Sequence, residues 1–253
     1  MTLSLTGCMS SLYTRTASND FSDTSKCNQV TDINTLVDNV ELMMDKTNAL
    51  TGTYKLDNGK QVYNIEFNAI TNKKRIDWDL YAKAKLKDKE VTVYLKNQKL
   101  YVIYPNNGAN VILKDSMENV VKEASTTLEN LDAQYNKEKL ESYLTGDKFE
   151  GFDFGMMREK GSYVLKDNVY TITLEHNGLT WEYDISTTSY LIKETRCSAD
   201  YFDSVLKFSY PKELSITYPM GLDFLTMNIE DVKDILNVNS FSELLQPDID
   251  VVE

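Results

Sequence analysis

The strongest constraint on the fold is a two-residue alternation of apolar and polar side chains that recurs along most of the chain. Its clearest stretch covers residues 76–86, whose apolar positions are Ile76, Trp78, Leu80, Ala82, Ala84 and Leu86. Successive side chains of a strand point to opposite faces of a sheet, so this stretch predicts a strand with one dry and one wet face. Turn residues recur about every 8 to 12 positions, which favours antiparallel neighbours.

Helical periodicity interrupts the strands in three places. Residues 31–50 have an apolar face, and Thr31 or Asp32 can cap the first turn. Near the middle, residues 116–144 predict two consecutive helices, with Ser116 as N-cap and an apolar stripe that includes Met117, Val120, Val121 and Leu128. A helical tail is expected over residues 228–246. Residues 31–253 are therefore interpreted as a single β-rich domain.

This order of elements predicts the fold class. About six strands precede the central helices and about five follow them, so one face of a wide antiparallel sheet has to be buried. We expect an α+β fold in which the sheet curls into an open half-barrel, with helices packed in its concave face. Tight packing would make that concavity an ordinary core, whereas loose packing would leave an apolar cavity.

Composition excludes several classes of function. The net charge is −12 and the pI about 4.7, so a phosphate backbone would be repelled and nucleic acid is not an expected partner. The single histidine, His176, rules out a cluster of histidine metal ligands. No phosphate-binding loop, nucleophile elbow or metal-ligand spacing is present, and Asp77 and Asp79 are interpreted as solvated charges. We therefore expect neither an enzyme nor a bound cofactor or metal.

The start of the chain carries a short motif, Leu5-Thr6-Gly7-Cys8, followed by a polar segment. It resembles the lipobox of bacterial lipoproteins, in which the cysteine becomes lipidated after the signal peptide is cleaved. The resemblance implies that residues 1–8 are the remnant of a signal peptide, that Cys8 is the lipid anchor and that residues 9–30 are a tether. Only seven residues precede Cys8, without a basic segment, so we expect the chain to begin inside the signal peptide. The predicted location is the extracytoplasmic face of the cell membrane.

Two further cysteines are present, Cys27 and Cys197. If Cys8 carries lipid, these two form an even pair in an oxidising compartment, where a disulfide between them would close a loop of about 170 residues. Two free thiols are the alternative.

The combination of lipobox, tether, helix, strands, central helices and further strands resembles the LolA and LppX/LprG-like lipoproteins. The resemblance covers residues 31–218 and rests on the order of elements, so it assigns no individual residue. It implies a half-barrel whose helices and sheet enclose acyl chains, such as palmitate, or the lipid part of lipoproteins.

On this resemblance, we expect a monomeric, membrane-anchored lipoprotein that binds or carries an acyl chain. The pocket would be lined by the dry faces of the best strands and by the central helix: Tyr63, Ile65, Phe67, Ile76, Trp78, Leu80, Val93, Leu95, Met117, Val120, Val121 and Leu128. The alternative is a structural or interaction lipoprotein of the cell envelope whose sheet is filled by its own side chains.

Overall fold

The computed structural model describes residues 13–57, 62–72, 77–86, 89–96, 99–106, 109–116, 119, 152–176, 178–199, 202–218, 225–228 and 230. Its elements are β1 (Tyr13–Ser18), α1 (Ile33–Asp45), β2 (Ala49–Asp57), β3 (Val62–Asn72), β4 (Asp77–Leu86), β5 (Lys89–Lys96), β6 (Lys99–Asn106), β7 (Ala109–Ser116), α4 (Phe154–Lys160), β8 (Ser162–Lys166), β9 (Val169–His176), β10 (Leu179–Ser186), β11 (Ile192–Ala199), β12 (Phe202–Ser209), β13 (Glu213–Tyr218) and β14 (Leu225–Met227).

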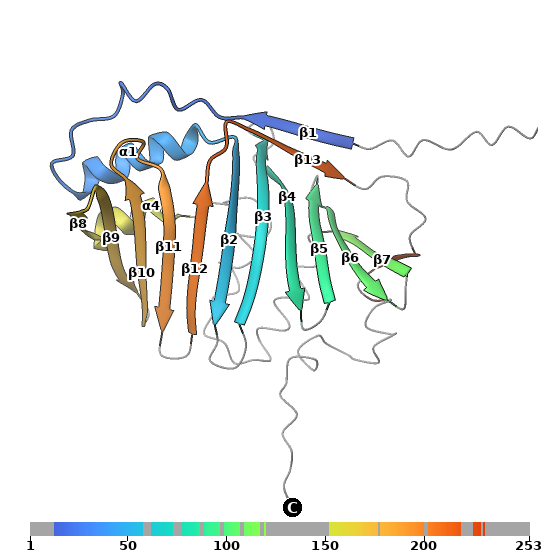
Figure 1. Cartoon of the computed structure of the whole chain (residues 1–253). Coiled ribbons are helices and arrows are strands. Elements are labelled where there is room, and N and C mark those ends of the chain that lie inside the picture. Colours follow the sequence, from blue (N-terminus) through green and yellow to red (C-terminus); the bar gives the residue numbers. More distant parts are fainter. Residues whose placement is uncertain are drawn as a thin grey trace, which may run out of the picture.

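A twelve-stranded sheet dominates the molecule, in the order β14-β7-β6-β5-β4-β3-β2-β12-β11-β10-β9-β8 (Figure 1). All neighbours are antiparallel except β14, which pairs with β7 in parallel. The first run of strands proceeds outward from β2 to β7, and the second returns from β8 to β12. The pairing of β12 with β2 joins the two runs in the middle of the sheet. The fold is therefore mostly β, and the large antiparallel sheet predicted from the alternation is confirmed.

The two helices pack against one face of this sheet, which we call the inner face. Leu36, Val37 and Val40 of α1 and Met157 of α4 form a buried cluster with side chains of β9, β10 and β11. Asp32 caps α1, because its carboxylate accepts a hydrogen bond from the Thr35 amide at 2.8 Å. These contacts close the inner face over the β8–β11 half of the sheet.

The opposite, outer face carries a second core beneath the two-stranded ribbon β1–β13. Ile216 and Tyr218 of β13 are buried against Ala49 of β2 and Ile70 of β3. Figure 1 shows this ribbon crossing one end of strands β2 to β5. Residues 13–18 were predicted to be part of a polar tether, but they form β1. Their short alternating sequence gave no sign of the distant strand β13 with which they pair.

Other differences concern the boundaries of elements. The first helix ends at Asp45, earlier than predicted, and β2 already begins at Ala49. The short helix α4 was not predicted. Strand β7 extends to Ser116, the residue predicted to cap the central helix. Apart from Ser116 and the helical residue Asn119, the predicted helices at 116–144 lie outside the described residues, as does nearly all of the tail at 228–246.

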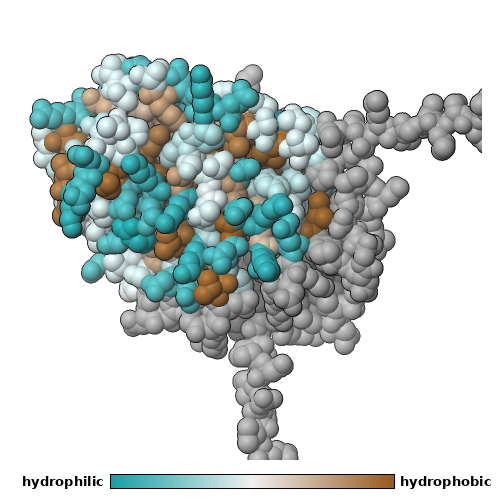
Figure 2. Space-filling model, viewed as in Figure 1, coloured by the Kyte–Doolittle hydropathy of each residue, from teal (hydrophilic) through white to brown (hydrophobic). Residues whose placement is uncertain are grey.

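No helix in the described part of the chain is long and apolar enough to cross a membrane. The surface seen in the orientation of Figure 1 is largely hydrophilic, with hydrophobic residues scattered over it (Figure 2).

Candidate functional site

The candidate site is the inner face of the sheet beyond the reach of α1 and α4, over strands β12 and β2 to β6. Strand register places apolar side chains of neighbouring strands side by side there. One row across the strands contains Leu206, Tyr54, Ile65, Ala84 and Val91. The next contains Phe208, Gly52, Phe67, Ala82, Val93 and Val102. Together they form a continuous apolar surface several strands wide.

Burial differs sharply between the two halves of this inner face. Under the helices, Ile172, Ile185 and Ile192 are completely buried. On β3 and β5, the equally apolar side chains of Ile65 and Val93 are only partly buried. Within the described residues, the large apolar side chains of this surface are thus fully buried under the helices and only partly buried at Ile65 and Val93.

An aromatic cluster marks the border between the two halves. Phe208 of β12 makes edge-to-face contacts with Phe67 of β3, at 6.3 Å between ring centroids, and with Phe152, at 5.7 Å. Phe152, which precedes α4, also contacts Tyr183 of β10. Such aromatic pairs stabilise a fixed arrangement of rings, so this cluster forms a firm wall at the end of the open half.

Six predicted pocket residues lie together on the inner face: Tyr63, Ile65, Phe67, Leu80, Val93 and Leu95. The backbone of Trp78 continues the same face, in register with Thr71. Ile76, Met117, Val120, Val121 and Leu128 lie outside the described residues, so their place in the pocket stays a prediction. The proposed lipid anchor, Cys8, also lies outside them.

Sequence reasoning missed the contribution of β12 to this surface. Leu206 and Phe208 alternate with polar residues, which gives a strand signal, but nothing local indicates that β12 pairs with β2 across some 150 residues of chain. Tyr54 of β2, which lies beside Leu206, was likewise not predicted to line this surface.

The predicted disulfide is absent, since Cys27 and Cys197 are both free. Cys27 lies close to Tyr190, which precedes β11, whereas Cys197 lies far along β11 near Asp203. Five residues of strand, about 17 Å, separate Ile192 from Cys197, too far for a disulfide. Burial raises the pKa of the Cys197 thiol to about 11, as expected for a packed thiol that does not react.

Asp79 is also not the solvated charge that was predicted. It is almost fully buried on the outer face of β4, where it forms an ion pair with Arg15 of β1. Arg15 also donates to the Thr71 carbonyl at 3.0 Å. Asp79 therefore fastens the β1–β13 ribbon to the sheet. Among the described residues, no group of three or more histidine, cysteine or acidic side chains could hold a metal ion.

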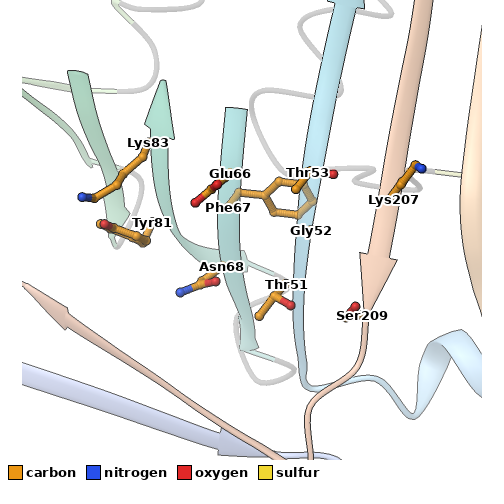
Figure 3. A pocket seen from close by; sticks show the side chains of 10 residues that line it. All are labelled: Thr51, Gly52, Thr53, Glu66, Phe67, Asn68, Tyr81, Lys83, Lys207 and Ser209. Carbon is orange, nitrogen blue, oxygen red and sulfur yellow. The ribbon is translucent and has the colours of Figure 1, made fainter. Parts of the chain in front are cut away.

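A hollow of about 480 Å³ lies over strands β12, β2, β3 and β4. Eight of its ten lining residues project to the outer face by strand register. We call it the outer hollow. Its two rows are Ser209, Thr51, Asn68 and Tyr81, and Lys207, Thr53, Glu66 and Lys83 (Figure 3). Most of its lining side chains are polar, with the ring of Tyr81 beside them, and it lies on the other face from the predicted acyl-chain pocket, so it is a separate site.

No family model and no curated protein sequence matches the chain. Among solved structures, LprF from Mycobacterium bovis is similar, with a TM-score of 0.48 and 12% identity over 75% of this chain and 97% of that one. The Mycobacterium tuberculosis lipoprotein LppX has a TM-score of 0.43 and 7% identity, over 70% of this chain and 93% of that one. A LolA superfamily protein from Nitrosomonas europaea has a TM-score of 0.26 and 7% identity, over 71% of this chain and 92% of that one.

The structure is thus similar to proteins of the LppX and LolA type, as the order of elements predicted. Each of these scores is below 0.5. At these scores and identities the similarity concerns the fold and says nothing of what this chain binds.

Proposed function

We propose that this protein is a membrane-anchored extracytoplasmic lipoprotein that binds or carries an acyl chain on the open half of its inner face. The observation that carries the proposal is the contrast in burial along one apolar surface. Ile172 and Ile185 are sealed beneath the helices, whereas Ile65 and Val93 are partly exposed. An apolar ligand would complete the burial that the helices achieve elsewhere.

The hydrophobic effect supplies enough free energy for such a role. Burial of apolar surface contributes roughly 0.8 kcal/mol per methylene group, so a palmitate-length chain would gain on the order of 10 kcal/mol. The costs of association and of ordering a flexible chain reduce this gain. The remainder is suited to reversible binding, which a carrier requires.

The finer features of the proposal follow from the sequence. Cys8 would carry the lipid that holds the protein at the membrane, and two or more acyl chains give stable anchoring. The sheet would curl as a half-barrel around the ligand, and the apolar stripe of Met117, Val120, Val121 and Leu128 would cover it. Residues 31–253 would form one domain, to which β1 adds a strand, and the protein would act as a monomer without catalysis.

Native mass spectrometry tests this function on the full-length chain carrying Cys8→Ser, which removes the acylation site. We expect a stoichiometric, lipid-sized mass addition, or uptake of added palmitate, followed by identification of the lipid after extraction. A protein that is empty and also refuses palmitate and phospholipid would overturn the carrier proposal and favour a structural lipoprotein of the envelope.

Two neighbouring variants locate the site. Val93→Trp places a large ring on the inner face of β5 and should reduce palmitate uptake at least fivefold by occupying the site. Thr92→Trp places the same ring on the outer face of the same strand and should leave uptake unchanged. Equal uptake by both variants would place the lipid elsewhere.

A further inference from the structure

The outer hollow has a regular construction. In one row, Thr51 of β2 lies between Ser209 of β12 and Asn68 of β3. In the next row, Thr53 lies between Lys207 and Glu66. Neighbouring strands are about 4.8 Å apart, so the four strands from β12 to β4 span roughly 14 Å. Thr51 and Thr53 of β2 lie between Lys207 and Ser209 of β12 on one side and the side chains of β3 and β4 on the other (Figure 3).

The central side chains have hydrogen-bonding capacity to spare. Within the described part of the chain, the side chains of Thr51, Thr53, Glu66 and Asn68 make no hydrogen bond to another residue. They offer both kinds of group, since the amide of Asn68 and the hydroxyls donate and accept, and the carboxylate of Glu66 accepts. A ligand with matching donors and acceptors can form hydrogen bonds with these groups.

The lysines at the two margins are already engaged. Lys83 forms an ion pair with Glu90 at 2.9 Å, and Lys207 forms one with Glu194 at 3.4 Å. With Glu66 between them, the hollow offers no uncompensated positive charge to a phosphate. The ring of Phe67 lies over Gly52 on the inner face, so Tyr81 is the aromatic residue of the lining that projects to the outer face.

Tyr81 gives the hollow one rigid wall. Its ring packs against Tyr94 at 5.2 Å between centroids and belongs to the core beneath the β1–β13 ribbon. A fixed aromatic wall beside alternating donors and acceptors suits a ligand whose hydroxyl groups stand around a ring with apolar C–H faces.

We propose that the outer hollow is a binding site for a saccharide. Asn68 and Glu66 form hydrogen bonds with the sugar's hydroxyl or amide groups, and Thr51 and Thr53 form the floor beneath it. The hollow lies in mid-sheet, on the face opposite the acyl-chain site, so its ligand is a free or polymeric glycan and not the headgroup of a lipid bound on the inner face. The proposal does not depend on the proposed lipid binding.

Titration of the isotope-labelled full-length chain with the β-1,4-linked trimer of N-acetylglucosamine and, separately, with maltotriose tests the site by two-dimensional NMR. Sites of this open kind bind weakly, with dissociation constants on the order of millimolar. We expect saturable shifts of the backbone amides at 51–53 and 66–68 with at least one of the two sugars. Shifts confined to other strands, or no saturable shift with either sugar, would overturn the proposal.

Matched variants separate recognition from general surface effects. Asn68→Ala should weaken binding about fivefold, as expected for the loss of one good hydrogen bond. Asn64→Ala removes the same side chain from the same face of β3, outside the hollow, and should leave the affinity unchanged. Equal affinities for the two variants and the parent would contradict the assignment, and thermal melts would confirm that both variants are folded.

Discussion

At the scale of single residues, Gly52 shows how closely the middle of the sheet is packed. It lies on β2 between Phe208 and Phe67, and a Cβ atom placed on it would collide with the Phe67 ring and with the backbone carbonyl of Lys207. A backbone atom in a central strand cannot yield cheaply, so this position requires glycine for space and not for an unusual backbone angle.

Gly52→Ala should therefore destabilise the protein by about 2 kcal/mol, in the range of other overpacking substitutions. Urea denaturation monitored by circular dichroism measures the change. Gly155→Ala is the control, because its Cβ would meet only the Asp153 carboxylate at 3.5 Å, and alanine favours the helix α4. If Gly52→Ala proved as stable as Gly155→Ala, the close packing of β2 against β12 would be wrong.

Asp184 should make the stability of the folded protein depend on pH. Burial raises its pKa, but hydrogen bonds from Arg196 and Thr171 outweigh burial and lower the pKa overall. A carboxylate with a lowered folded-state pKa contributes stability that is complete above its unfolded pKa, near 4, and is lost as the pH falls through the folded value.

Asp184→Asn should thus cost about 1 to 2 kcal/mol at neutral pH and much less at acidic pH. Unfolding free energies at pH 7 and near pH 3 test this. Glu175→Gln changes an exposed carboxylate on the neighbouring strand β9 that makes no hydrogen bond with any described residue, so it should show no comparable pH dependence. A loss of the same size at both pH values would contradict the role of the charged form.

At the scale of elements, the start of α1 depends on one cap. The Asp32 carboxylate accepts hydrogen bonds from both the amide and the hydroxyl of Thr35, at 2.8 and 2.9 Å. Asp32→Ala should lower the melting temperature, because the Thr35 amide loses its hydrogen-bond acceptor. Asn34→Ala, an exposed substitution in the first turn of the same helix, is the control and should leave the melting temperature close to that of the parent. Equal melting temperatures would argue against the cap.

The β1–β13 ribbon depends on a buried ion pair. Arg15→Met would leave the Asp79 carboxylate buried without its partner, at a cost of about 3 to 5 kcal/mol. The double variant Arg15→Met, Asp79→Asn should recover much of this loss, because the uncompensated charge is gone. A double-mutant cycle by chemical denaturation tests the pair, with Thr16→Ala on β1 as a mild control. Additive losses from the two single changes would mean that the residues do not interact.

Local patterns predicted the elements of this fold well and their long-range pairings poorly. The alternation at 76–86 predicted a strand with a dry face, and α1 and its cap follow from the spacing and from Asp32. Partners distant along the chain leave no such signal. For that reason the ribbon, the pairing of β12 with β2 and the burial of Asp79 by Arg15 were all missed.

At the scale of the whole molecule, one sheet has two unlike faces. Its inner face is largely apolar, buried beneath α1 and α4 over β9 to β11, whereas Ile65 of β3 and Val93 of β5 are only partly buried. Its outer face carries the ribbon and the outer hollow. The strand part of the predicted pocket could be found from the sequence, because every second residue of a strand points to the same face of the sheet. The helical part of the predicted pocket lies outside the described residues. The predicted disulfide was wrong because the number of cysteines does not show how far apart they lie in the fold.

The most direct test of acyl-chain binding is photo-crosslinking with a palmitate analogue that carries a diazirine along its chain, followed by peptide mapping. We expect crosslinks on inner-face residues of β3 to β5, such as Ile65 and Val93, competed by unlabelled palmitate and absent from Thr92 and Lys83 on the outer face. Crosslinks spread over both faces, or none that palmitate competes, would contradict the claim that the open half of the inner face is an acyl-chain site.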